Sequence, residues 1–208
     1  MRITSSEALE LLNGARGKTP HDGWIDHSIC VGNAASKIAE ALNIKGYNID
    51  IDKIKTLGYI HDIGKKFGWN NHEGVIPHAI NGYKYIKELG YDDEYASVCI
   101  KHSFLNNDIN CLANDRDYTD SSDDNYEFIK NYISGEYTIY EKIICLCDLM
   151  CKTSIMTIDK RMNDLLTRHG VFKNTHYHII ETNKLKKNFD DMLGYNLYDL
   201  FPEIKENL

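Results

Sequence analysis

The chain has 208 residues, of which 42% are hydrophobic and 26% are charged, a composition typical of a globular protein. Its 24 basic and 31 acidic residues give a formal net charge of −7, which argues against non-specific binding to nucleic acid or to an anionic membrane. No apolar stretch approaches the roughly 20 residues that span a bilayer, and the start lacks a signal-peptide pattern. We therefore expect a cytoplasmic protein whose six cysteines are reduced.

Helical periodicity of apolar residues recurs along the chain, and no segment alternates convincingly as a strand does. Thr4 and Glu7 form a capping box that predicts a first helix over 4–13. The stretch 106–125 is rich in Asn, Asp and Ser and predicts a long surface loop, a type of segment that often serves as a lid or a binding element. Further helices are predicted, in chain order, over 24–42, 51–63, 78–89, 93–105, 126–133, 138–152, 156–169 and 181–193.

These elements predict an all-α fold in one domain that covers residues 1–208. We expect a core over about 24–155, preceded by the N-terminal helix and followed by a C-terminal helical tail over 156–208. Within that tail, Arg168 lies near a predicted helix end and is interpreted as a capping or solvated residue. The polar stretch that contains His176 and His178 is interpreted as loop.

Several metal-ligand residue types fall on the apolar faces of the predicted helices. A single histidine in such a place is more often a hydrogen-bonded core residue. The two acids are harder to explain, because Asp62 in "LGYIHDIGKKFG" and Asp148 in "IICLCDLMC" are costly to bury without a cation or strong donors. One shared site would resolve all of these burials, and imidazole with carboxylate suits Fe, Mn, Co or Zn better than calcium. The candidate ligands are His27, His61, Asp62, His78, His102 and Asp148.

This ordered set resembles the HD superfamily of metal-dependent phosphohydrolases, which are helical bundles. The resemblance implies that His27, the pair His61-Asp62 in "HDIGK" and Asp148 bind one metal ion. It further implies that two later histidines, in "PHAINGYKYI" and "CIKHSF", bind a second ion, with Asp62 bridging the two. The second HD dipeptide, at 21–22, lies in a Gly/Pro loop and is interpreted as accidental.

The sequence departs from the family pattern at two positions. Cys30 stands where many relatives have an arginine after the first histidine. Ser103 stands where some cyclic-dinucleotide hydrolases have a second histidine, which weakens cyclic di-GMP as a substrate.

The resemblance implies hydrolysis of a phosphate ester or anhydride in a small, nucleotide-like molecule by a metal-activated hydroxide. Two divalent ions, Fe, Mn, Zn or Co, are the expected cofactors. Asp62 is expected to be catalytic as the bridge between them. Lys65 is expected to be catalytic through contact with a substrate phosphate, and Lys152, one turn after Asp148, is a second candidate for substrate binding. The oligomeric state is left open, and a dimer is compatible with the sequence.

Two other functions remain open at this point. Some relatives with six ligands hold two irons and oxidise phosphonates or inositol, and the ligand set alone does not separate such a di-iron oxygenase from a hydrolase. A non-catalytic, nucleotide-sensing helical module would also use these residues.

Overall fold

The computed structural model describes residues 1–68, 76–109 and 124–206, and the regular elements within these ranges are helices. The prediction of an all-α fold is therefore confirmed. The α-helices are α1 (Ser5–Ala15), α2 (Gly23–Ile44), α3 (Ile51–Ile60), α4 (Ile76–Glu88), α5 (Asp93–Ala96), α6 (Val98–Lys101), α7 (Asp124–Tyr132), α8 (Ile139–Asp148), α9 (Ile158–His169), α10 (Thr175–Leu193) and α11 (Pro202–Glu206). Three 3₁₀-helices accompany them, η1 (Ile63–Phe67), η2 (Leu105–Asn107) and η3 (Leu197–Leu200).

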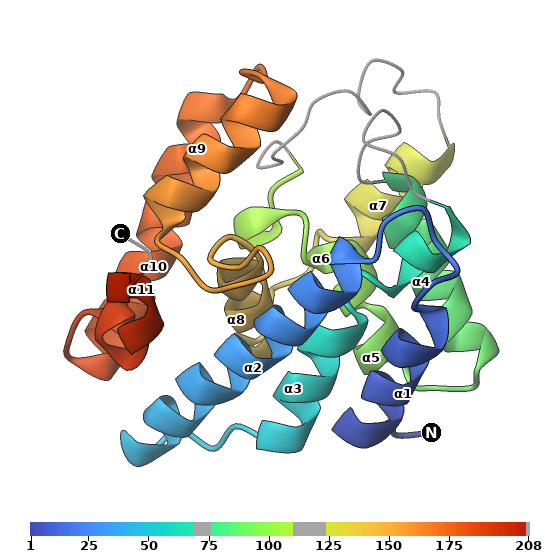
Figure 1. The fold of residues 1–208 in the computed structure, drawn as a ribbon, viewed down its shortest axis with the longest axis horizontal. Coiled ribbons are helices and arrows are strands. Elements are labelled where there is room, and N and C mark those ends of the chain that lie inside the picture. The colour runs from blue at the N-terminus through green and yellow to red at the C-terminus, as the bar shows by residue number, and fades with distance from the viewer. Residues whose placement is uncertain (69–75, 110–123, 207–208) are drawn as a thin grey trace.

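Helices α2 and α3 pack along each other in the middle of the molecule, with α8 against both (Figure 1). Their backbones approach closely at Gly32 and Gly58, where a Cβ added to Gly58 would lie 2.4 Å from the Cα of Gly32. The hydroxyl of Tyr59 donates to the Asn33 side chain across the same contact, at 3.1 Å. This close crossing brings the start of α2 next to the end of α3.

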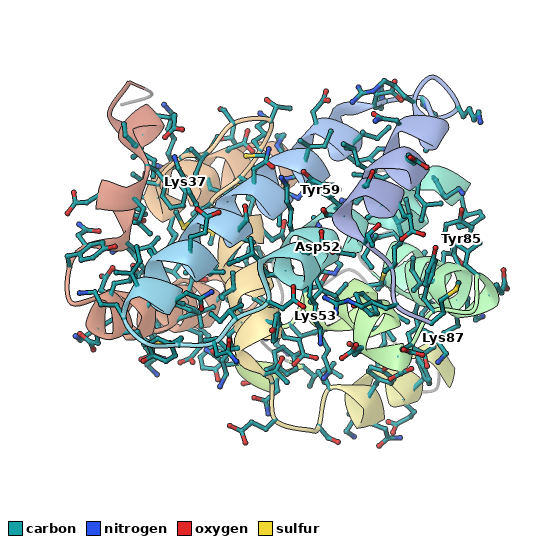
Figure 2. The ribbon with its side chains drawn as sticks, turned by 90° about the horizontal axis from the view of Figure 1, so that it is seen from below. Lys37, Asp52, Lys53, Tyr59, Tyr85 and Lys87 are labelled. Atoms are coloured by element: carbon teal, nitrogen blue, oxygen red, sulfur yellow. The ribbon has the colours of Figure 1, made fainter. Side chains whose placement is uncertain are left out.

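Helix α1 covers α3, and its attachment follows from its first residues. The capping box at Thr4 and Glu7 is formed as predicted. The hydroxyl of Ser5 donates to Oδ1 of Asp52 on α3 at 2.6 Å, and Asp52 is labelled in Figure 2. The first helix is thus tied to α3 by a side-chain hydrogen bond as well as by its apolar face.

One hydrophobic cluster extends from Ile3 to Ile204 and includes apolar residues of the C-terminal helices. Helix α10 packs against both α8 and α2, and α9 contacts α10 on the left of Figure 1. None of the helices in the described ranges has both the length and the apolar character needed to cross a membrane. Residues 110–123, which make up most of the predicted acidic loop and include Cys111, lie outside the described residues.

Several helix boundaries differ from the sequence prediction. Helix α3 ends at Ile60, so His61 and Asp62 form the turn into η1 instead of lying inside a helix over 51–63. The predicted helix over 93–105 is broken into α5, α6 and η2, which leaves His102 just past the end of α6. Helix α8 ends at Asp148, because the chain then folds back in a short turn closed by the Met156 N–H on the Met150 carbonyl.

The interpretation of His176 and His178 as loop residues is wrong. Helix α10 begins at Thr175, whose hydroxyl accepts a hydrogen bond from the Phe172 N–H at 2.9 Å. His178 lies on the inner face of this helix, 1% exposed, with its ring beside that of Phe172. This polar stretch therefore forms a helix that buries one of its two histidines.

Candidate metal centre

The six predicted ligands meet in one place, although they come from elements spread over more than half of the chain. His27 lies in the first turns of α2, and His61 and Asp62 follow α3. His78 belongs to α4, His102 follows α6, and Asp148 ends α8. The histidines and Asp62 are buried, and the Asp148 side chain is 25% exposed. The structure thus assembles a mostly buried cluster of four imidazoles and two carboxylates.

The Oδ2 atom of Asp62 faces one part of this cluster. The Nε2 atoms of His27 and His61 lie 3.7 and 3.6 Å from it. Oδ1 of Asp148 lies 2.9 Å from Nε2 of His27 and 3.9 Å from Nε2 of His61. We refer to Asp62 Oδ2, His27, His61 and Asp148 as the Oδ2 side.

The other carboxylate oxygen of Asp62 faces the remaining two histidines. Nε2 of His78 lies 3.2 Å and Nε2 of His102 lies 3.5 Å from Asp62 Oδ1. Asp62 Oδ1 is buried and has no hydrogen-bond partner among the described residues. We refer to Asp62 Oδ1, His78 and His102 as the Oδ1 side. Each oxygen of one carboxylate therefore lies in its own group of donors that could bind a metal ion.

Main-chain carbonyls fix the orientation of three of the rings. The Nδ1 atoms of His27, His61 and His102 bond to the carbonyls of Lys152, Gly58 and Val98, at 3.1, 2.7 and 3.0 Å. Because a carbonyl only accepts, each Nδ1 carries the hydrogen of the neutral ring, and each Nε2 presents a lone pair to the cluster. This is the arrangement found in metal-binding histidines.

The spacing of donors on the Oδ2 side fits a bound ion. The Nε2 atoms of His27 and His61 lie 3.2 Å apart, so two lone pairs face each other unless a cation or a proton lies between them. The donor–donor distances that involve His27 or His61 on this side run from 2.9 to 3.9 Å. Four ligands at tetrahedral positions about 2.1 Å from an ion are separated by about 3.4 Å. The residues present therefore suit a divalent transition metal in size and in chemistry.

Burial keeps three of the four imidazoles in the form that binds metal. It lowers the pKa of His78 and of His102 to about 4 and lowers the pKa of His61 as well. A neutral ring is required for ligation, since a protonated ring has no lone pair to offer. The three histidines are consequently ready to bind metal at neutral pH.

The two acids are ionised despite their surroundings. Burial alone would raise the pKa of Asp62, but the nearby Lys65 ammonium and the imidazoles hold it well below its usual range. Burial likewise opposes ionisation of Asp148, whose pKa is kept low by the contact of its carboxylate with His27 and by the nearby rings of His61 and His102. The cluster thus combines two carboxylates with neutral imidazoles, a donor set typical of Fe, Mn, Co and Zn sites.

The predicted substrate-binding lysines lie in different places. The Lys65 ammonium contacts Oδ2 of Asp62, so it lies at the centre. The Lys152 ammonium instead pairs with Asp164 on α9 at 2.7 Å, and only its main-chain carbonyl touches the cluster, at His27. A contact of Lys152 with substrate remains a prediction. Arg168, interpreted above as a cap or solvated residue, also binds Asp164.

Sequence reasoning assigned no role at the site to two residues beside the candidate ligands. The hydroxyl of Ser103 lies 2.9 Å from Nε2 of His102, the nitrogen that faces Asp62. Gly64 packs on α4 so tightly that an added Cβ would lie 1.9 Å from the carbonyl oxygen of His78 and 2.5 Å from the Gly82 nitrogen. A glycine two residues after a buried acid was the available signal for this contact. It brings α4, and with it His78, against Asp62.

The chain is similar to proteins of one known family over more than half of its length. The family model described as HD domain matches residues 24–150. An uncharacterized protein of Methanocaldococcus jannaschii is 31% identical over 78 residues, which cover 38% of this chain and 43% of that protein. The match thus spans less than half of that relative. The crystal structure of the Listeria monocytogenes phosphodiesterase PgpH HD domain aligns with a TM-score of 0.47 and 18% identity, covering 88% of this chain and 98% of that one, a likeness too weak to bear on function.

Proposed function

The chain belongs to the HD domain family, and from this premise we propose that it is a metal-dependent phosphohydrolase. Its substrate is a phosphate ester or anhydride of a small, nucleotide-like molecule. The observation that carries the proposal is the position of Asp62, whose two oxygens each face a separate group of imidazoles. A carboxylate placed in this way can bridge two divalent ions.

We assign one ion to each side of Asp62. His27, His61 and Asp148 would hold the first with Oδ2, and His78 and His102 would hold the second with Oδ1. Bound divalent ions, with Fe, Mn, Zn and Co as the candidates, polarise phosphoryl oxygens and lower the pKa of a coordinated water. The mixture of imidazole and carboxylate donors selects these four metals.

The protein's own residues supply orientation and charge. The carbonyls that bind Nδ1 of His27, His61 and His102 hold the three rings in place before any ligand arrives. The Lys65 side chain is 14% exposed, and its ammonium lies beside Asp62. There it can pair with an incoming phosphate and offset the negative charge that develops on the phosphate oxygens. Such a contact adds no bond to the substrate and acts by electrostatics alone.

The test compares the two HD dipeptides of this chain. Purified protein reconstituted with manganese or ferrous iron is offered phosphodiesters, phosphomonoesters and nucleotides, and the released orthophosphate or phosphomonoester is measured. Release should disappear in Asp62→Ala and in His61→Ala, because both remove a donor from the cluster. It should persist in His21→Ala, a matched change in the other HD dipeptide, where the side chain is exposed.

Three results would overturn the proposal. Phosphate release that survives Asp62→Ala would place the chemistry elsewhere. Oxygen consumption by the di-iron form without phosphate release would favour an oxygenase. Tight nucleotide binding with no turnover of any substrate, in protein that holds its metal, would favour a sensing module.

A further inference from the structure

A serine hydroxyl contacts the metal-facing nitrogen of one candidate ligand. The hydroxyl of Ser103 lies 2.9 Å from Nε2 of His102. On the other side of the same ring, Nδ1 lies 3.0 Å from the Val98 carbonyl. Because a carbonyl only accepts, Nδ1 carries the hydrogen of the neutral ring and Nε2 carries the lone pair. The Ser103 hydroxyl therefore donates its hydrogen to Nε2 of His102.

This hydrogen bond differs from those of other helical hydroxyl groups in the chain. The Thr56 hydroxyl donates to the Asp52 carbonyl at 2.7 Å. The Thr182 hydroxyl donates to the His178 carbonyl at 2.8 Å. Both acceptors lie four residues earlier, which is the usual local partner of a Ser or Thr in a helix. Ser103 lies in the turn directly after α6, but its hydroxyl bonds to an imidazole instead of to a preceding carbonyl.

The lone pair that Ser103 occupies is the one that an ion on the Oδ1 side would use. Nε2 of His102 lies 3.5 Å from Oδ1 of Asp62, and His102 is buried. A neutral imidazole has one lone pair in the ring plane, so Nε2 cannot accept a hydrogen bond and bind a metal ion at the same time. An ion can bind His102 only after the O–H···N bond has been broken and the Ser103 hydroxyl has turned away.

The Oδ2 side has no such competitor among the described residues. The Nε2 atoms of His27 and His61 lie 3.2 Å apart, and no hydroxyl of the described residues donates to either of them. Ser28 directly follows His27 in the chain, but its hydroxyl donates to the Trp24 carbonyl at 2.9 Å. Competition for a ligand's lone pair is therefore found on the side that has fewer donors for an ion.

We propose that Ser103 sets the metal affinity of the Oδ1 side by donating to His102 while no ion is bound and releasing it when an ion binds. This inference rests on the proposed function, because it takes the two-sided metal centre as its premise. The hydrogen bond stabilises the metal-free form, so it weakens binding of the ion on the Oδ1 side. Ser103 acts through His102 and is a positioning residue.

The test titrates chelator-treated, full-length protein with Mn²⁺ and follows binding by calorimetry. The binding step of the Oδ1 side is identified by its disappearance in His102→Ala. Ser103→Ala should tighten this step by about two- to tenfold, as expected for loss of one hydrogen bond from the metal-free form, and should leave the other step unchanged. Ser28→Ala is the matched control. It removes a hydroxyl that also follows a candidate ligand but donates to a carbonyl, so both steps should stay as in wild type.

Thermal denaturation with and without Mn²⁺ separates this effect from a purely structural one. Ser103→Ala leaves Nε2 of His102 without its donor, so the metal-free protein should melt at a lower temperature. With saturating Mn²⁺ the melting temperature should match that of wild type, because the tighter binding offsets the lost stability. An equal decrease in both forms, with unchanged affinity, would make the hydroxyl merely structural and overturn the inference. Weaker Mn²⁺ binding in Ser103→Ala would also overturn it, because the hydroxyl would then be a ligand.

The inference and the proposed function fail in different ways. If phosphate release depends on Asp62 but Ser103→Ala binds Mn²⁺ as wild type does, the role of Ser103 is wrong and the hydrolase stands. If Ser103→Ala tightens the Oδ1-side step as expected but no substrate is turned over, the role of Ser103 stands and the hydrolase is wrong.

Discussion

The two sides of Asp62 are built from different kinds of structure. The Oδ2 side takes its donors from α2, α3 and α8, helices of 22, 10 and 10 residues that pack on one another. The Oδ1 side takes His102 from the end of a helix of four residues and His78 from the first turn of α4. The Oδ2 side offers four donors from the protein, and the Oδ1 side offers three. Fully liganded metal sites are typically structural, whereas open ones leave positions for water and substrate.

This difference implies a division of roles. The ion on the Oδ2 side would be held tightly and would complete the packing of α2, α3 and α8. The ion on the Oδ1 side would be held more weakly and would exchange more readily. The partly buried Lys65 lies at Oδ2. The positive charge that would contact a substrate phosphate therefore belongs to the Oδ2 side.

The largest expected effect comes from removing one ligand on each side. His102→Ala should retain about one ion per chain after dialysis, because the four donors of the Oδ2 side are intact. His27→Ala should retain less than one, because it leaves three donors on each side. Both should lose turnover by more than the roughly 10–100-fold typical of losing an outer partner of a metal ligand. Elemental analysis of dialysed protein and phosphate release measure the two effects.

His21→Ala serves as the control for both variants, since its side chain is exposed in the turn before α2. Equal metal content in His27→Ala and His102→Ala would contradict the proposed difference between the sides. Turnover that is unaffected in His102→Ala would mean that a single ion suffices.

The next largest effect is expected at Lys65. Lys65→Met keeps most of the stem but removes the charge beside Asp62, and turnover should fall about 10²–10³-fold, as for the loss of one preorganised electrostatic contact. Metal content should stay near the wild-type value. Lys66→Met is the matched control, because the Lys66 ammonium lies 3.8 Å from the centre of the Tyr85 ring instead of at the cluster. Loss of metal together with activity in Lys65→Met would make the lysine structural.

The sequence was sufficient to single out the six candidate ligands because two of them are acids in apolar surroundings. Asp62 and Asp148 could not be buried at low cost without partners, and the histidines on neighbouring helical faces supplied them. All six meet in the structure. The all-α class followed from periodicity in the same way, since long apolar faces with a period of 3.6 admit few other structures.

Other features depend on contacts between distant segments and could not be predicted from the spacing of residues along the sequence. The end of α3 before His61 is coupled to the packing of Gly64 on α4, a contact that periodicity does not encode. The Lys152 side chain turns to Asp164 because α9 folds back over the turn after α8. The burial of His178 depends on the ring of Phe172, which lies outside α10. In each case the deciding partner lies in another element.

Low pH should destabilise the metal-free protein because the two histidines of the Oδ1 side resist protonation in the folded state. Burial lowers the pKa of His78 and His102 from 6.5 to about 4. Between these values the unfolded chain binds protons on both rings and the folded protein does not, so the free energy of unfolding falls as the pH decreases. Each ring contributes at most about 3 kcal/mol to the free energy of unfolding. This contribution is fully present above pH 6.5 and is lost as the pH falls to about 4.

Urea denaturation of chelator-treated protein at about pH 7 and about pH 5 measures this slope. His78→Gln should flatten it by removing one of the two groups. The same slope in wild type and in His78→Gln would show that the acid sensitivity arises elsewhere in the chain.

The smallest effect is expected at the glycine contact that supports the Oδ1 side. In Gly64→Ala the new Cβ meets the His78 carbonyl, so the backbone of α4 must shift, at a cost of about 1–3 kcal/mol in the free energy of unfolding. Because that shift carries His78 away from Asp62, the variant should lose the Oδ1-side ion first and keep the other. Gly58→Ala, which clashes with Gly32 between α2 and α3, should instead reduce occupancy on the Oδ2 side. Gly14→Ala in α1, where nothing lies within 4 Å, should stabilise the protein by up to about 1 kcal/mol with unchanged metal content. Equal losses of both ions in Gly64→Ala and Gly58→Ala would mean that the two sides form a single cooperative unit.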